Sequence, residues 1–249
     1  SSENRVVFRD DPVNGPNHLK EAGKPIGHQN RYLAVGNYET IDDVFNNAQT
    51  GSINSVAPGQ VVPGDFIYID FDSNGILNGQ DKVAVDELNY PLHTYGLNLG
   101  FDWKGLSFSA MFYAPTGVYK LVNSVYSASF KSGKINAQPD VMNAWTPETA
   151  NTSGVRAPAL HLTNDGAFNG TESTYRYQNF SYLRLKTMEL GYNLPKKWLK
   201  TVGLKSLQVY VTGNNLLTWW GGDDRIDPEG EQAKYPILRS FTAGVRVSF

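Results

Sequence analysis

The sequence predicts an all-β fold, an antiparallel transmembrane β-barrel, and three alternating stretches carry that prediction. In residues 241–249 one face of an extended strand is apolar and the other polar, because side chains alternate with period two. Residues 95–103 and 106–112 repeat the pattern on either side of the turn Lys104-Gly105. A strand of a soluble sandwich can alternate in the same way. The recurrence, in strands of about nine to eleven residues that can cross a membrane at a tilt, favours a barrel.

The composition of the 249 residues argues against several other classes of protein. Basic and acidic residues number 22 and 24, and this balance disfavours a nucleic-acid-binding surface. Without cysteine, the sequence can hold no disulfide, zinc–thiolate site or thiol nucleophile. The sequence contains no run of about 18 apolar residues, so it predicts no transmembrane helix. A mean hydropathy of −0.39 is compatible with barrel strands, because they alternate.

The first half of the chain carries few regular elements. Residues 41–48 are predicted to form a short helix capped by Thr40 or Asp42, and residues 66–69 a short strand. After the hairpin, residues 115–180 lack periodicity and are rich in Ser, Asn, Pro and Gly. They are predicted to form a long extracellular loop, with a possible strand near 118–126 and a helical turn near 140–145.

The last 70 residues return to β-structure. Residues 182–194 are predicted to form a strand, but Leu183 and Leu190 fall on opposite faces unless a bulge occurs near Thr187. Pro195 suits the start of a short helical connection. The next strand is predicted at 207–212, followed by a polar loop over 214–236 and then the last strand.

Strand parity predicts an orientation. If the C-terminus is periplasmic, the two short connections are periplasmic turns and the long ones are extracellular, which is the asymmetry of outer-membrane barrels. Five strands cannot close a barrel on their own. We therefore expect the chain to be part of a larger barrel.

An ordered set of motifs supports a more specific interpretation. The motifs occupy residues 64–83, 91–106, 143–149, 181–199, 207–218 and 245–249. Together they resemble the C-terminal portion of the SusC/RagA family of TonB-dependent outer-membrane transporters from Bacteroidetes. The resemblance covers roughly residues 21–249.

The resemblance implies a location in the bacterial outer membrane and a 22-stranded barrel with an N-terminal plug that draws energy from TonB. It also implies a SusD-like surface lipoprotein that caps the barrel and delivers glycans or peptides. The plug, the TonB-contacting segment and most of the strands have no counterpart here. The chain is therefore expected to pair with the remaining N-terminal part of the same barrel and to contact outer-membrane lipid.

The sharpest local motif is D-F-D-S-N-G-I-L-N-G-Q-D, residues 70–81, whose spacing matches a calcium loop. The candidate ligands are Asp70, Asp72, Asn74, the Ile76 carbonyl, Asn78 and Asp81. Because Asp81 stands where such loops usually have glutamate, its reach is shorter. The predicted role of Ca²⁺ is structural. The alternative is a turn rich in Asp and Asn that holds no metal.

The predicted loop over 214–236 contains two further candidates. Asp223, Asp224, Asp227 and Glu229 could be paired carboxylates of a glycosidase, although a solvated loop face is favoured. Trp219 and Trp220 could stack on a sugar or dock a partner, but an aromatic girdle at the membrane interface is favoured.

Polar residues that alternate with the apolar ones could face a lumen. The candidates are Asn98, Asp102, Ser107, Ser109, Tyr113, Gln208, Tyr210 and Arg246. The default interpretation is that these side chains only keep the lumen wall hydrated. The four histidines show no metal-binding spacing. The preferred function is thus a transporter barrel segment without enzymatic activity. The alternatives are a soluble β-sandwich that binds carbohydrate and an enzyme that uses the acidic loop.

Overall fold

The computed structural model describes residues 5–8, 16–47, 61–122, 142–149, 158–160, 169–200, 203–222, 225–230 and 235–249. The chain divides into two compact units. The first consists of residues 1–89 and 119–178, and the second of residues 90–118 and 179–249. Among the described residues, no helix is long and apolar enough to cross a membrane.

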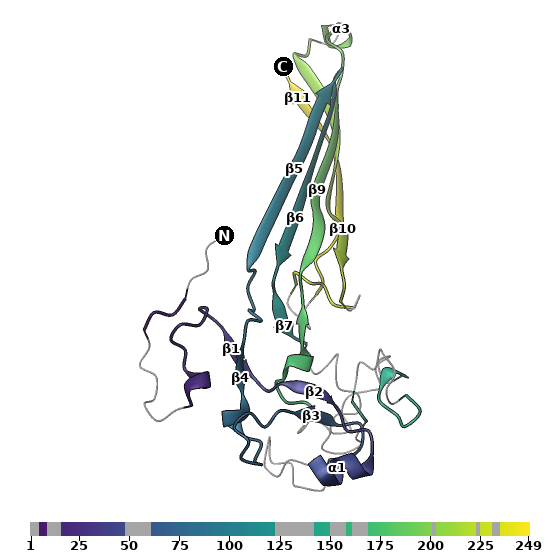
Figure 1. The fold of residues 1–249 in the computed structure, drawn as a ribbon. Coiled ribbons are helices and arrows are strands. Elements are labelled where there is room, and N and C mark those ends of the chain that lie inside the picture. The colour runs from purple at the N-terminus through teal and green to yellow at the C-terminus, as the bar shows by residue number, and fades with distance from the viewer. Residues whose placement is uncertain are drawn as a thin grey trace. The chain divides into compact units, whose positions relative to one another are not determined.

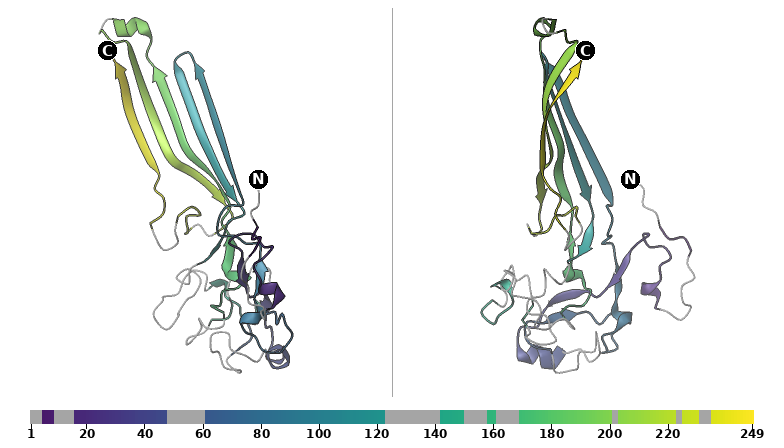
Figure 2. Two further views of the ribbon diagram at one scale, coloured as in Figure 1. Left: turned by 90° about the vertical axis from the view of Figure 1, so that its left-hand side faces the viewer. Right: turned by 180° about the vertical axis from the view of Figure 1, so that it is seen from behind.

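The second unit is built on one five-stranded antiparallel sheet (Figure 1). Its strands are β5 (His93–Trp103), β6 (Leu106–Thr116), β9 (Tyr182–Asn193), β10 (Ser206–Trp220) and β11 (Ser240–Ser248). They lie side by side in the order β11-β10-β9-β6-β5, so β5 and β11 form the edges (Figure 2, left). The three alternating stretches of the sequence are therefore strands, as predicted.

The hairpin turn has the predicted geometry. Lys104 and Gly105 have φ values of 47° and 90°, both positive as a type I′ turn requires. Trp103 pairs with Leu106 directly across the turn. At Gly105 a side chain has no room, because a Cβ would lie 2.9 Å from the carbonyl oxygen of Asn193.

The strand register gives the sheet one apolar and one polar face. One apolar row crosses all five strands and consists of Phe101, Phe108, Leu190, Val211 and Ala243. The adjacent row on the other face consists of Gly100, Ser109, Glu189, Thr212 and Thr242. Because side chains alternate along a strand, this opposition extends along the whole sheet.

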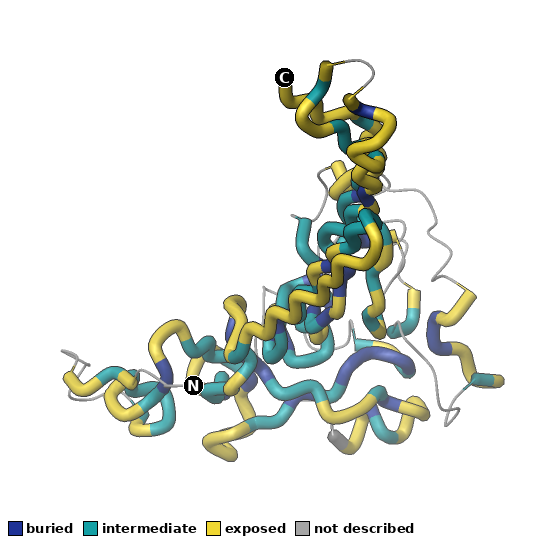
Figure 3. The backbone as a smooth tube through the Cα atoms, turned by 90° about the horizontal axis from the view of Figure 1, so that it is seen from above, coloured by how far each residue is buried: buried dark blue, intermediate teal, exposed yellow. Residues whose placement is uncertain are grey.

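The apolar face of the sheet is not covered by a second layer among the described residues. Leu99, Phe101 and Val211 are 48, 52 and 50 % exposed. The sheet consists mainly of exposed and half-buried residues (Figure 3). In a sandwich, large apolar side chains of one sheet pack against those of a facing sheet. The described sheet is therefore not half of a soluble sandwich.

The predicted bulge in β9 is present at Lys186. Against β6, Thr187 pairs with Met111 and Leu185 with Phe112, which leaves Lys186 as the extra residue. The extra residue shifts the alternation by one position. The leucines on either side of the bulge consequently share the apolar face.

Strand β10 is longer than predicted. The prediction of a loop from residue 214 is wrong as far as Trp220, where the strand ends. Two residues, Asn215 and Leu216, lie opposite the single residue Lys186, and Asn215 has a φ of 54°. This bulge interrupts the alternation on which the prediction depended.

The first unit contains short two-stranded sheets. Strand β1 (Gln29–Arg31) pairs with β4 (Val83–Val85), β2 (Ala34–Asn37) with β3 (Phe66–Tyr68), and β7 (Tyr119–Leu121) with β8 (Tyr177–Asn179). The helices in its described residues include η1 (Asn17–Leu19), α1 (Ile41–Asn47), η2 (Gly79–Asp81) and η5 (Thr174–Arg176). Its core cluster is Tyr32, Phe66, Tyr68 and Leu77.

The structure confirms the helix predicted near residue 41 and its cap. Thr40 Oγ1 accepts a hydrogen bond from the Asp43 N–H at 3.1 Å, and the Asp43 carboxylate accepts one from the Thr40 N–H at 2.9 Å. The predicted strand at 66–69 is β3.

The two ends of the segment 115–180 are strands and not loop, because they belong to β6, β7 and β8. Residues 123–126 of the predicted strand and 140–141 of the predicted turn lie outside the described residues.

Candidate functional site

A hydrogen-bonded network crosses the polar face of the sheet. Arg246 of β11 donates to both carboxylate oxygens of Glu189 on β9, at 2.9 and 3.1 Å, and to Gln208 Oε1 at 2.8 Å. Thr212 Oγ1 donates to Glu189 at 3.0 Å, and Gln208 Nε2 donates to Ser107 Oγ of β6 at 3.2 Å. The network therefore links four of the five strands through side chains.

Two glycines leave the space that this network needs. At Gly191 a Cβ would lie 2.6 Å from Ser107 Oγ and 2.8 Å from Gln208 Nε2, so a side chain there would separate the two. At Gly244 a Cβ would lie 2.5 Å from the Tyr210 hydroxyl. The Tyr210 ring in turn lies 4.0 Å from the Arg246 guanidinium carbon. The polar face is thus a packed wall.

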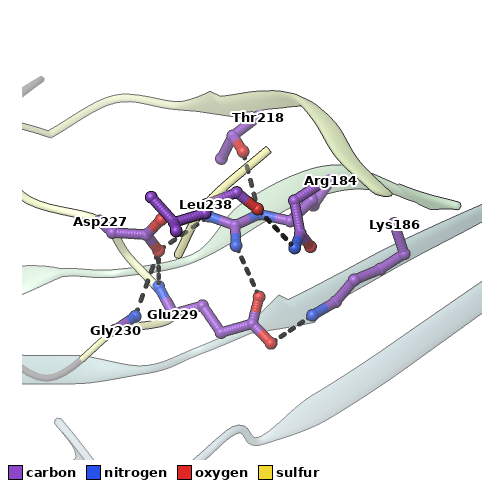
Figure 4. A network of polar contacts seen from close by, with 8 residues as sticks. Arg184, Lys186, Thr218, Asp227, Glu229, Gly230 and Leu238 are labelled. Atoms are coloured by element: carbon purple, nitrogen blue, oxygen red, sulfur yellow. Dashed lines mark hydrogen bonds and ion pairs between the residues drawn. The ribbon is translucent and has the colours of Figure 1, made fainter. Parts of the chain in front are cut away.

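A second network lies at the other end of the polar face, where residues 225–230 contact β9 (Figure 4). Its centre is Arg184, which is only 1 % exposed. Arg184 donates from Nε to Thr218 Oγ1 at 2.9 Å, and from its terminal nitrogens to Asp227 and Glu229 at 2.8 Å each. Lys186 pairs with the other oxygen of Glu229. The arginine therefore fastens the loop to the sheet.

Asp227 also organises the backbone of this loop. Its Oδ1 accepts hydrogen bonds from the N–H groups of Glu229 and Gly230, at 2.9 and 3.1 Å. Burial alone would raise the pKa of Asp227, but the bonds from Arg184 and from these N–H groups outweigh burial and hold that pKa below its ordinary value. Asp227 consequently remains an anion opposite the arginine.

This network bears on the prediction of paired catalytic carboxylates. Asp227 and Glu229 are both bound to Arg184, so neither is placed as a free acid or base. Asp223 and Asp224 lie outside the described residues. Sequence reasoning missed Arg184, although a charged residue between Leu183 and Leu185 in a predicted strand indicates a polar face.

The calcium-type loop, residues 70–81, follows β3 in the first unit. Asp70, Asp72 and Asp81 each bring one carboxylate oxygen within 4.8 Å of the other two. Gly75 has a φ of 78°, which glycine adopts without strain, and its N–H donates to Asp70 at 2.7 Å. Asn74 N–H donates to Asp70 at 3.2 Å. The sharp turn thus directs several oxygens toward one place.

Asp81 holds the two ends of this loop together. It is 1 % exposed and accepts hydrogen bonds from the N–H groups of Phe71 at 2.9 Å and Asn78 at 2.7 Å.

Desolvation would raise the pKa of Asp70, but the N–H donors of Gly75 and Asn74 outweigh it and lower that pKa. Ionised carboxylates with nearby amide and carbonyl oxygens form a donor set that fits a hard cation such as Ca²⁺.

Comparisons with known proteins identify the family of this chain. No family model matches it. TonB-dependent receptor P3 of Formosa agariphila is 30 % identical in an alignment of 206 residues that covers 77 % of this chain and 20 % of the relative. TonB-dependent receptor P26 of the same organism is 31 % identical in an alignment of 210 residues that covers 76 % of this chain and 20 % of the relative.

Solved structures agree with these relatives. The RagAB peptide importer in the closed-closed state is 25 % identical, with a TM-score of 0.61 over 94 % of this chain and 24 % of that chain. In its open-open state it is 23 % identical, with a TM-score of 0.63 over 92 % and 23 % of the two chains. The chain belongs to the TonB-dependent receptors of the SusC/RagA type.

The receptor chain spans about a fifth of the length of the curated relatives it matches. Its open sheet is accordingly a section of the wall of a larger transmembrane β-barrel in the outer membrane. The predicted barrel fold and outer-membrane location are confirmed.

The six principal lumen-facing candidates of the receptor lie on the polar face. They are Asn98, Asp102, Tyr113, Gln208, Tyr210 and Arg246. Gln208 and Arg246 belong to the first network, and the Tyr113 ring lies 5.5 Å from Lys186 Nζ, next to the second. That this face lines the lumen stays a prediction.

Trp219 and Trp220 of the receptor lie on β10 and not in a loop. They point to opposite faces. Trp219 pairs with Leu183 on the apolar face and is 48 % exposed. Trp220 packs against Phe180, with ring centroids 5.2 Å apart. Because they share no face, we expect only Trp219 to contribute to an aromatic girdle.

Proposed function

We propose that this chain forms part of the lumen wall of a TonB-dependent nutrient importer. The observation that carries the proposal is the division of the sheet into an exposed apolar face and a polar face packed by side-chain networks. Lipid is the medium that suits the first face, and a water-containing pathway suits the second. The proposed role is to bound the pathway and hold its extracellular connections, without catalysis.

The relatives support the wider assignment. The curated relatives are named TonB-dependent receptors, and RagAB is named a peptide importer. We propose that the intact receptor couples to TonB through a plug outside this chain and imports peptides or glycans delivered by a SusD-like surface lipoprotein. The strands that close the barrel would come from the remaining N-terminal part of the receptor.

Thiol labelling of neighbouring residues tests which face meets water. Because this chain contains no cysteine, single substitutions introduce one thiol at a time into it. In the intact receptor in outer membranes, Asn98→Cys and Thr242→Cys should react with a charged maleimide at least about tenfold faster than Leu97→Cys and Ala243→Cys. The reason is that maleimide reacts with the thiolate, which forms where the thiol is hydrated. The rates are measured by gel shift.

Each pair of variants is its own control, since the two residues are adjacent on one strand and differ only in face. Similar labelling within both pairs, or faster labelling on the apolar side, would reject a wall with lipid on one side and water on the other.

We further propose that the loop at residues 70–81 binds Ca²⁺ as a structural ion. The ligands would be Asp70, Asp72, Asn74, the Ile76 carbonyl, Asn78 and Asp81. The clustering of three carboxylates supports this, because a cation would relieve their mutual repulsion. The loop begins two residues after β3, whose Phe66 and Tyr68 are in the core of the first unit. A bound ion would therefore stabilise that core.

Limited proteolysis of the intact receptor tests this proposal. At a Ca²⁺ concentration 100 times the dissociation constant, local unfolding of the loop should be about 100-fold rarer than with chelator, and cleavage there correspondingly slower. The double variant Asp70→Asn, Asp72→Asn should lose this protection. Asp42→Asn, in α1, removes one carboxylate outside the loop and should keep this protection. Protection that persists in the double variant would contradict a site at this loop.

A further inference from the structure

One end of the five-stranded sheet carries an unusual number of lysines. This end holds the β5–β6 turn, the short helix α3 (Lys196–Leu199) and the C-terminal end of β11 (Figure 1). Its lysines, here called the basic rim, are Lys104, Lys196, Lys197, Lys200 and Lys205. All five are exposed, and no salt bridge among the described residues involves them.

The charge of the rim is not balanced locally. In residues 100–108, 190–200, 203–210 and 244–249, Asp102 is the one acidic residue. The chain as a whole has a net charge of −2. The rim is therefore a local cationic zone on a chain that is otherwise slightly acidic.

Backbone hydrogen bonds join the segments of the rim into one surface. Asn193 N–H donates to the Gly105 carbonyl at 2.7 Å, which ties the two connections together. Lys205 N–H donates to the Ser248 carbonyl at 2.9 Å. The buried side chain of Leu199 anchors α3, so its lysines stay near the strand ends.

Aromatic side chains accompany the lysines. Trp103 and Tyr192 lie on the apolar face of the sheet and are 62 and 42 % exposed, and Trp198 of α3 is 63 % exposed. Lys104 Nζ lies 4.9 Å from the centre of the Trp103 ring. Exposed Trp and Tyr at a strand end prefer the depth where hydrocarbon meets headgroups. Lysines just beyond them reach the level of the phosphates.

We propose that the basic rim binds the phosphate-bearing headgroups of acidic phospholipids. The inference rests on the proposed role of the sheet as a barrel wall. A phospholipid matches the whole surface, because its phosphate can meet the ammonium groups while its chains lie on the adjoining apolar face. A soluble anionic partner would meet only the lysines. With the orientation that strand parity predicts, the lipid belongs to the periplasmic leaflet.

Native mass spectrometry of the intact receptor tests the proposal. The receptor is titrated in detergent with phosphatidylglycerol or with phosphatidylethanolamine, and the bound lipids are counted. Phosphatidylglycerol should bind the wild type at least about tenfold more tightly than a variant in which all five rim lysines are replaced by glutamine. Phosphatidylethanolamine should bind both proteins equally.

Two further variants separate charge from position. Arginine at the five positions keeps the charge and should restore the binding. Lys20→Gln with Lys82→Gln removes charge from the first unit and should leave it unchanged. Equal binding of phosphatidylglycerol by the wild type and the five-glutamine variant, or a loss caused equally by the Lys20 and Lys82 changes, would overturn the proposal.

The result can be separated from failure of the barrel-wall function. Heat-modifiable migration of the folded barrel on gels, together with the thiol-labelling pattern, reports the wall independently of bound lipid. If both are normal and lipid preference is absent, only the lipid site is rejected.

Discussion

Replacing Arg184 by methionine should weaken the attachment of residues 225–230 to the sheet by about 3–5 kcal/mol. Methionine fills most of the volume of Arg184, but it leaves the charge of Asp227 without its cation and leaves Glu229 with Lys186 alone. A largely buried charge without compensation is the costly outcome. The measurement is hydrogen exchange at the Glu229 and Gly230 amides, which donate to Asp227. Exchange there should accelerate by about two to four orders of magnitude.

Lys186→Met is the matched control, since it removes a neighbouring cation that also contacts Glu229. Lys186 is 25 % exposed and Arg184 remains in place, so the cost should be about 1 kcal/mol or less. Equal acceleration in the two variants would contradict the central role of Arg184.

The pH dependence of amide exchange gives a second check on the contact between Arg184 and Asp227. The pKa of Asp227 is lowered in the folded receptor, so its contribution to stability is present above the unfolded pKa of about 3.9 and is lost as the pH falls through the folded pKa. The wild-type amides should therefore lose protection below about pH 4. The Arg184→Met variant, which lacks the pairing, should change less in that range.

The transmembrane strands were the part of this fold most open to sequence reasoning. An uninterrupted alternation defines β5, β6 and β11, because a strand with one apolar and one polar face has a sequence period of two. The second half of β10 was missed because the bulge at Asn215 and Leu216 reverses the alternation. The short sheets of the first unit were also largely missed, since strands of three or four residues are too short to show a period.

The candidate sites also differ in how far the sequence alone predicts them. Spacing within one loop was enough to predict that Asp70, Asp72 and Asp81 come together, because neighbouring residues of a tight turn must lie close. The pairing of Arg184 with Asp227 and Glu229 joins residues that are 43 and 45 positions apart. Only the folding of residues 225–230 against the polar face brings them together. Local sequence contains no signal for such a contact.

Replacing Leu99 by arginine should destabilise the receptor barrel by about 2–4 kcal/mol, because the guanidinium would enter the hydrocarbon near the middle of the bilayer. Leu99 lies near the centre of β5 on the apolar face and is 48 % exposed. The adjacent Asn98 lies on the polar face, so Asn98→Arg keeps its charge hydrated and should cost less than about 1 kcal/mol. Both values come from denaturant unfolding of the intact receptor in phospholipid vesicles, with identical conditions for the wild type.

The two substitutions place the same charge on the same strand one residue apart, so the difference between them isolates the medium that each face contacts. An equal cost at both positions, or a larger cost at Asn98, would mean that the apolar face does not lie against lipid.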